Sequence, residues 1–404
     1  MRAAQGESRR KEGLGAWRAR GAVVLLGLAL AVLAVGSGLD REARLQPSLA
    51  RSVPWPFAAE ATLVRGRGLL ATGQYGAVAD EAAAAIRAAP VDPESTALLG
   101  AARTGLGEAA RAEQAFLVAG RLGWRAPLTQ FYWFERAAEV GDSRVAALRL
   151  DAILRASPAL MENSGLLAPL EASEAGRAAL ADRLAAGPDW LKPYADGLGA
   201  TNPTQVAIRA EVLNRLAASG HPLGCAGAGS LAGQLVAFGN VALAYELWRQ
   251  HCPARTGALL NDAGFAGLQV HQPDSPFDWT VIGDSDVSLS VDSQPDGARR
   301  LLLASSAAFP RKMLTQLVRL APGGYRLSWR ATDAAGADRD RVVATVSCRP
   351  DSHDWLPARL DPASHRFSAD LTIDGSCPGL WIGFALLPGT DPISFGAIDL
   401  QPRR

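Results

Sequence analysis

The sequence predicts a multidomain protein with an N-terminal transmembrane helix, an all-α domain of helical repeats and a C-terminal all-β sandwich. Three observations predict it. Residues 21–39 carry no charge, apolar residues recur three and four apart from Phe57 onward, and from Leu259 they alternate with polar residues. These are the patterns of a bilayer span, of amphipathic helices and of half-buried strands. A chain of 404 residues is also too long for one ordinary core.

The charge distribution predicts the topology of the N-terminal helix. The chain as a whole has a net charge of +1, which argues against a nucleic-acid partner. Residues 1–20 hold six basic and two acidic residues, so this leader carries +4 and the remainder −3. The positive-inside rule makes 1–20 a cytoplasmic basic leader and 21–39 a single-pass signal-anchor in a bacterial inner membrane, with the bulk periplasmic. Ala34-Val35-Gly36 also resembles a cleavage site, so a removed signal peptide stays an alternative.

Four cysteines fall into two pairs, Cys225 with Cys252 and Cys348 with Cys377. The absence of a C-x-x-C motif and of any Cys/His cluster argues against zinc and thioredoxin-like redox sites, and the sequence predicts neither a metal nor a cofactor. In an oxidising compartment each pair predicts a disulfide, which would stabilise the fold by roughly 3–4 kcal/mol. Four buried free thiols are the alternative.

A period of 34 residues marks the helical region. Residues 40–56 are polar and Pro-rich and are expected to form a linker. After them Gly73, Gly107 and Gly141 are expected to close the first helix of each pair, and Pro90, Trp124 and Pro158 the second. Residues that pack the two helices recur at the same spacing: Val78, Ala112 and Ala146; Ala82, Phe116 and Leu150; Ala85, Ala119 and Ile153.

This constellation resembles the tetratricopeptide (TPR) family, whose 34-residue unit is a pair of antiparallel helices. The resemblance covers about residues 59–160. It departs from the family at Phe134, where a small residue is usual. Helical spacing continues in 177–186, 205–218 and 231–251, so we expect a solenoid of some five hairpins over residues 57–255. Its groove would hold envelope proteins. The Gly-rich stretch 224–229 lacks a following Gly-Lys-Ser/Thr and is expected at a helix junction.

Residues 259–404 are expected to form an antiparallel sandwich, because short alternating segments are separated by Pro, Gly and Asp clusters. The alternating positions are Val287, Leu289 and Val291; Tyr325, Leu327 and Trp329; Phe367, Ala369 and Leu371. The stretches 260–265, 317–329 and 395–400 resemble the galactose-binding-like jelly rolls of carbohydrate-binding modules. The resemblance implies a jelly-roll fold and a polysaccharide as partner, and it allows a structural calcium at Asp399.

Sugar binding requires exposed aromatic rings beside polar groups. Trp279 and Trp329 are expected in the core. In 380–387 the bulky residues share one face, which leaves Trp381 on the opposite face. Trp355 follows the polar residues 351–354. Trp381 and Trp355 are therefore the candidate glycan contacts.

No catalytic residue is predicted. The block Gly283-Asp284-Ser285 is similar to that of serine esterases, but no helix is expected after Ser285, and Asp361 and His365 do not have the required spacing. We therefore expect a periplasmic scaffold in the assembly or export of a surface exopolysaccharide rather than an enzyme. The alternative is an envelope enzyme, or an enzyme accessory that targets glycan through its β domain.

Overall fold

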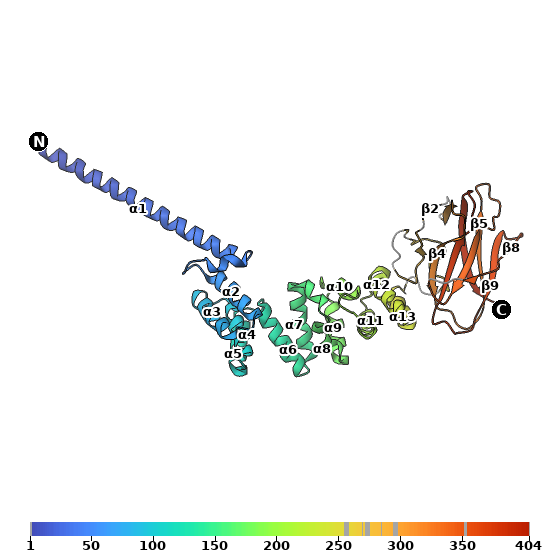
Figure 1. Cartoon of the computed structure of the whole chain (residues 1–404), viewed down its shortest axis with the longest axis horizontal. Coiled ribbons are helices and arrows are strands. Elements are labelled where there is room, and N and C mark those ends of the chain that lie inside the picture. The colour runs from blue at the N-terminus through green and yellow to red at the C-terminus, as the bar shows by residue number, and fades with distance from the viewer. Residues whose placement is uncertain are drawn as a thin grey trace. The chain divides into compact units, whose positions relative to one another are not determined.

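The structure, a computed structural model, describes residues 2–253, 258–268, 270, 275–283, 285–293, 298–350 and 354–403, and for 2–20 and Ser164 the backbone alone. An N-terminal apolar helix, a series of shorter helices and a sandwich of two antiparallel sheets follow one another along the chain (Figure 1), which confirms the predicted fold class. The chain forms two compact units, Met1–Ala156 and Ser157–Arg404.

The first unit opens with α1 (Arg2–Glu42) and the short 3-10 helix η1 (Pro47–Arg51). Within the described residues, Gly21–Glu42 is the one helical stretch long and apolar enough to cross a membrane. The segment 40–56, expected as a linker, is folded. Its buried residues Ala43, Ala50 and Val53 pack with Ala61 of the next helix in one apolar cluster.

Three helical hairpins complete this unit, and their bounds repeat every 34 residues. They are α2 and α3 (Ala59–Ala71, Tyr75–Ala88), α4 and α5 (Pro93–Gly105, Ala109–Leu122), and α6 and α7 (Pro127–Glu139, Ser143–Ala156). Gly73, Gly107 and Gly141 lie between the two helices of each hairpin with φ of 71°, 77° and 76°. This left-handed conformation favours glycine, which explains the period seen in the sequence.

The hairpins are packed by the small and large residues that the period picked out. Val78, Ala112 and Ala146 are each at most 1% exposed, as are Ala85 and Ala119. Phe116 lies against Gly100 of α4, where an added Cβ would come within 2.8 Å of the ring. A missing side chain on one helix therefore makes room for a ring on the next.

The second unit begins with η2 (Pro158–Glu162) and six helices that lose the strict period. They are α8 (Ser164–Glu171), α9 (Glu174–Leu184), α10 (Leu191–Ala195), α11 (Pro203–Ala218), α12 (Gly224–Ala237) and α13 (Val241–His251). The Gly-rich stretch 224–229 forms the first turns of α12. Gly239 separates α12 from α13 with φ of 81°, and Ala244 and Trp248 of α13 are buried.

The sandwich of the same unit has a five-stranded sheet in the order β1-β4-β10-β6-β7 and a six-stranded sheet in the order β2-β3-β11-β5-β9-β8. The strands are β1 (Thr280–Val281), β2 (Val287–Ser293), β3 (Arg299–Ser305), β4 (Arg311–Val318), β5 (Gly323–Thr332), β6 (Val342–Ser347), β7 (Asp354–Trp355), β8 (Arg359–Asp361), β9 (Arg366–Ile373), β10 (Leu380–Leu386) and β11 (Ile393–Pro402).

Large aromatic side chains fill the space between the two sheets. Trp329 of β5 and Trp279 are buried as predicted, at 0% and 2% exposure. Phe384 of β10 connects them, with ring centroids 5.5 Å from Trp329 and 6.0 Å from Trp279, and it lies 4.8 Å from Phe395 of β11. The alternation seen in the sequence thus directs one face of every central strand into this core.

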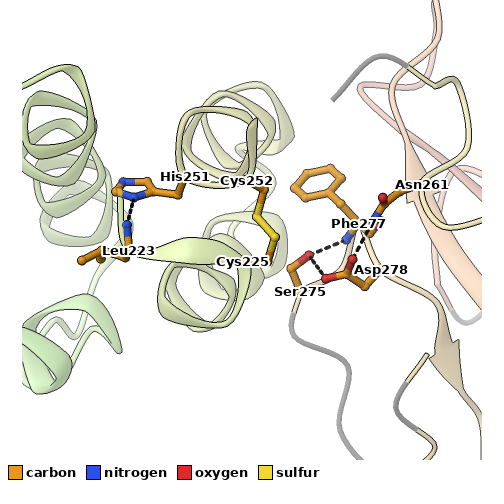
Figure 2. Close-up of a disulfide and its surroundings, with 8 residues drawn as sticks. All are labelled: Leu223, Cys225, His251, Cys252, Asn261, Ser275, Phe277 and Asp278. Carbon is orange, nitrogen blue, oxygen red and sulfur yellow. Dashed lines mark hydrogen bonds between the residues drawn. A yellow bond between two sulfur atoms is a disulfide. The ribbon is translucent and has the colours of Figure 1, made fainter. Parts of the chain in front are cut away.

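Both predicted disulfides form. Cys225 of α12 is bonded to Cys252 just after α13, with the Cα atoms 5.0 Å apart, and Cys348 is bonded to Cys377 with the Cα atoms 5.4 Å apart. Figure 2 shows the first bond across the α12–α13 hairpin, close to Phe277 at the entry to the sandwich. The Phe277 ring lies 5.4 Å from both Tyr245 and Trp248 of α13. The last hairpin is therefore covalently closed and packed on the β domain.

Candidate functional site

The outer face of the five-stranded sheet holds both candidate tryptophans. Directly opposed residues of an antiparallel pair point to the same side of the sheet. Trp381 of β10 opposes Leu317 of β4 on one side and Ser347 of β6 on the other. In the next outward row Gly383 opposes Thr315 and Thr345, and Thr345 in turn opposes Trp355 of β7. We call Trp355, Trp381, Thr345, Ser347 and Gly383 the tryptophan face.

The two rings differ in accessibility. Trp355, on the edge strand β7, is 45% exposed, whereas Trp381 on the central strand is half-buried. Ile382 and Phe384 of the same strand are fully buried between the sheets. Because side chains alternate between the two faces of a strand, Trp381 points away from the core, as the sequence predicts. The two positions are two strand spacings apart, with β6 between them, and are offset by two residues along the strands, so they are roughly 12 Å apart.

The polar residues between the two tryptophans are almost fully covered, with Thr345 1% and Ser347 7% exposed. Gly383 has no side chain, and an added Cβ would lie 2.8 Å from Thr345 Oγ1, so the threonine covers that position. Ser347 Oγ donates to the backbone carbonyl of Arg349, and Lys312 Nζ donates to that of Pro350 at 2.9 Å. The accessible groups of this face are therefore the rings of Trp355 and Trp381 and the side chain of Lys312, rather than the buried hydroxyls. The alternation of β6 could have revealed Thr345 and Ser347, but not their place beside Trp381.

The second disulfide fixes one end of the tryptophan face. Cys348 follows Ser347 directly, and Cys377 lies three residues before β10. The bond therefore ties the end of β6 to the start of the strand that holds Trp381, and it closes the segment leading to Trp355. Residues 351–353 of that segment, which include His353, lie outside the described residues, as do His271 and Asp284.

Helix α13 covers the β4 side of the same sheet face. Leu317, which opposes Trp381, is only 2% exposed. At Gly379 an added Cβ would lie 2.8 Å from Val241 of α13 and 2.9 Å from Leu317. The β4 side of the face is therefore covered, and Trp355 of β7 is the most exposed residue of the tryptophan face.

His251 is a structural residue of the helical hairpin rather than a catalytic base. It is 1% exposed, and its Nδ1 accepts from the Leu223 amide at 2.9 Å (Figure 2) while Nε2 lies 3.1 Å from the Leu213 carbonyl. These partners correspond to a neutral ring with the proton on Nε2. Burial lowers the pKa of His251 to about 4.

A buried charged cluster, invisible in the sequence, holds α8 to α11. Arg209 Nε lies 3.2 Å from Glu171 Oε1, the Tyr194 hydroxyl donates to the same oxygen at 3.3 Å, and Arg209 Nη1 donates to the Leu198 carbonyl. Burial raises the pKa of Glu171 against the lowering effect of Arg209, and it raises that of Tyr194 well above its usual value. Tyr194 is fully buried, Tyr194 and Arg209 both bond Glu171, and the Arg209 guanidinium lies 4.9 Å from the centre of the Tyr194 ring, so the arrangement is structural.

The esterase-like residues of the sequence do not meet. Ser285 lies two residues before β2, at one edge of the six-stranded sheet, whereas His365 directly precedes β9, next to the opposite edge. The His365 Nδ1 lies 2.8 Å from Asp338 rather than bonding Asp361, whose carboxylate accepts from Ser364. Asp399 accepts from Gln401, and the described residues contain no group of three or more potential metal ligands.

The first unit has a candidate protein-binding groove. A cavity of about 390 Å³ opens between the first helices of its three hairpins. Leu70, Leu98 and Leu128 supply an apolar lining, and Arg67 and Glu94 form an ion pair at its margin. The residues that define the repeat do not line this cavity, because they pack the helices together.

No family model and no curated protein matches this chain. Solved structures match about a third of it, and three of them are described here. The carbohydrate-binding module TmCBM61 in complex with β-1,4-galactotriose is 14% identical over 37% of this chain and 100% of its own, with a TM-score of 0.26. A protein of Bacteroides thetaiotaomicron described as sugar binding is 10% identical over 36% and 100%, with a TM-score of 0.27.

The third match is the enzymatically active domain of tailspike protein 4 of bacteriophage CBA120. It is 10% identical over 36% of this chain but only 21% of its own, with a TM-score of 0.26. Similarity at this level does not determine a ligand, so the candidate site rests on the residues of this chain.

Proposed function

We propose that this protein is a membrane-anchored periplasmic scaffold whose sandwich binds a polysaccharide on the tryptophan face. The observation that carries the proposal is the register that directs Trp355 and Trp381 to the same outer side of one sheet. Two aromatic positions roughly 12 Å apart on one side of a sheet suit an extended oligosaccharide better than a single sugar. Assembly or export of a bacterial exopolysaccharide is the process that such a scaffold would serve.

Retention of the N-terminal helix is supported by its packing. Gly36 and Asp40, at the end of the apolar run, are buried against the residues that follow α1. A cleavage after Gly36 would remove a helix that the folded chain uses as a packing partner. The two disulfides support an oxidising compartment for the second unit.

The helices of the first unit are proposed to be TPR-like and to bind an envelope protein. The 34-residue spacing of their bounds and the glycine between the helices of each hairpin support this. The apolar cavity between α2, α4 and α6 would accept an apolar side chain of the partner, and the Arg67–Glu94 pair would bond polar groups beside it.

The glycan proposal is tested with the full chain in detergent on an array of bacterial polysaccharides. We expect retention of at least one polysaccharide, and weaker retention by the Trp355→Ala and Trp381→Ala variants. Phe309→Ala is the matched control, because Phe309 is 69% exposed but precedes β4 and does not belong to the tryptophan face. Equal loss in all three variants, or binding to no glycan, would contradict the proposal.

The chain is proposed to act without catalysis. The alternative role of envelope enzyme or enzyme accessory is tested by incubating any retained polysaccharide with the full chain and following its length. If the Trp355→Ala variant still shortens the polysaccharide, and a substitution outside the tryptophan face abolishes the shortening, the chain is an enzyme and the scaffold proposal is wrong.

A further inference from the structure

The chain folds back beside the last apolar turn of α1. Phe57 lies against Gly36, where an added Cβ would be 2.5–2.8 Å from the ring. Gly36 is three residues before the end of the uncharged run 21–39. Because an α-helix rises 1.5 Å per residue, the Phe57 ring lies roughly 5 Å below the end of the apolar run. The loop that holds Phe57 is therefore level with the last part of the helix that would lie in hydrocarbon.

This loop is fixed to α1 and cannot be treated as a free tether. The carboxylate of Asp40, on α1, accepts hydrogen bonds from the backbone amides of Glu60 at 3.0 Å and Ala61 at 2.8 Å. It thereby satisfies two amides of the first turn of α2. Ala43, Ala50 and Val53 are buried in the same small cluster. The end of the apolar helix and the start of the first hairpin are one packed body.

Trp55 projects from this body two residues before Phe57 and is 89% exposed. Such exposure is unfavourable for an indole in water, whereas the boundary between hydrocarbon and headgroups accommodates both its apolar rings and its N–H. Arg51, exposed at the end of η1, provides a cation on the same segment that suits lipid phosphates.

We propose that Trp55 inserts into the headgroup region of the periplasmic leaflet of the membrane that α1 spans. The inference rests on the proposed anchoring and specifies how the body is held to the lipid. Two contacts, α1 and Trp55, would then fix the orientation of the first hairpin toward the membrane surface. A single-helix anchor followed by a flexible linker would leave that orientation free.

The test uses the full chain in phospholipid nanodiscs, with an environment-sensitive fluorophore on one introduced cysteine, since all four native cysteines are paired. Label sites are Trp55→Cys, Val91→Cys as the matched control and Leu28→Cys within the apolar run. Val91 is 77% exposed between α3 and α4. Quenchers are attached to the lipid chains near the headgroup or at mid-chain.

We expect the label at 55 to be blue-shifted and quenched at least twofold by the shallow quencher, the label at 28 to be quenched most by the deep one, and the label at 91 to be unaffected. Quenching at 28 without quenching at 55 would overturn the inference and leave the anchor intact. Absence of quenching at 28 would overturn both.

A second variant tests the geometry. Gly36→Leu places side-chain atoms where the Phe57 ring lies, so the loop should leave its position and the quenching at 55 should fall by at least half while that at 28 persists. Unchanged quenching at 55 in Gly36→Leu would show that the Gly36–Phe57 contact does not position Trp55.

Discussion

The helical hairpins of the first unit and the sandwich of the second both bury apolar side chains, but these side chains differ in size. The hairpins bury small side chains, with Val78, Ala85 and Ala119 each at most 1% exposed. The sandwich buries large rings, with Trp329, Phe384 and Phe395 at 0%. Helices that meet at alanine and glycine approach closely, whereas two sheets about 10 Å apart must be filled by bulky groups. The stability of the hairpins should therefore be lowered mainly by substitutions that add atoms, and that of the sandwich by substitutions that remove them.

Removing a ring from the sandwich gives the largest expected effect. Trp329→Ala leaves a cavity between the sheets and should lower the free energy of unfolding by about 3–5 kcal/mol. Chemical denaturation of the full chain measures this change when the unfolding of the second unit is monitored. Trp355→Ala is the matched control and should change stability by less than about 0.5 kcal/mol, because Trp355 is 45% exposed. A comparable loss in the two variants would show that Trp355 belongs to the core.

Opening a disulfide should distinguish the two units, because all four cysteines lie in the second. In the chain-entropy account each loop contributes roughly 3–4 kcal/mol. Replacing Cys225 and Cys252 by alanine should lower the stability of the second unit by that amount, and the first unit should unfold as before. A shift in the unfolding of the first unit after reduction would contradict the division of the chain.

Acid should also act on the second unit, through His251. Its pKa is about 4 in the folded chain and about 6.5 in an unfolded one. Between these values the unfolded chain binds more protons, so the free energy of unfolding falls as the pH is lowered from about 6.5 to 4, by up to about 3 kcal/mol.

The variant His251→Gln tests this pH dependence. It should be less stable than the native chain at pH 7, but its free energy of unfolding should change less between about pH 4 and 6.5. His221→Gln, at an exposed histidine, should keep the slope of the native chain. An unchanged slope in His251→Gln would show that another group causes the acid sensitivity.

Added atoms should destabilise the hairpins by a smaller amount. Gly100→Leu forces side-chain atoms into the space of the Phe116 ring and should cost about 1–3 kcal/mol. Gly68→Leu in α2, where nothing lies within 4 Å of an added Cβ, should instead stabilise by about 0.5 kcal/mol through helix propensity. Thermal unfolding of the first unit compares the two. Equal effects would mean that small residues are not needed for the packing.

The sequence predicted the features that depend on local periodicity. Gly73, Gly107 and Gly141 defined the hairpins because a left-handed turn requires glycine at each of them. Alternation in 325–329 placed Trp329 in the core, and the spacing of the cysteines suggested the bonds that form.

Features that depend on contacts between distant segments could not be predicted from the sequence. Arg209 of α11 bonds Glu171 of α8, and the spacing of these two helices along the chain does not follow the 34-residue period. Asp40 lay in a segment that looks like a linker, and its role as the cap of α2 follows only from the return of the chain. Trp355 and Trp381 were both selected, but the register that directs them to one face depends on β6 lying between their strands.

The dissociation constant of the full chain for a retained polysaccharide tests the central claim most directly. Titration of the native chain, Trp355→Ala and Phe309→Ala with the same glycan provides the comparison. The account predicts that Trp355→Ala raises the dissociation constant at least tenfold, which corresponds to about 1.4 kcal/mol, while Phe309→Ala changes it by less than twofold. Equal dissociation constants for the native chain and Trp355→Ala would contradict the account.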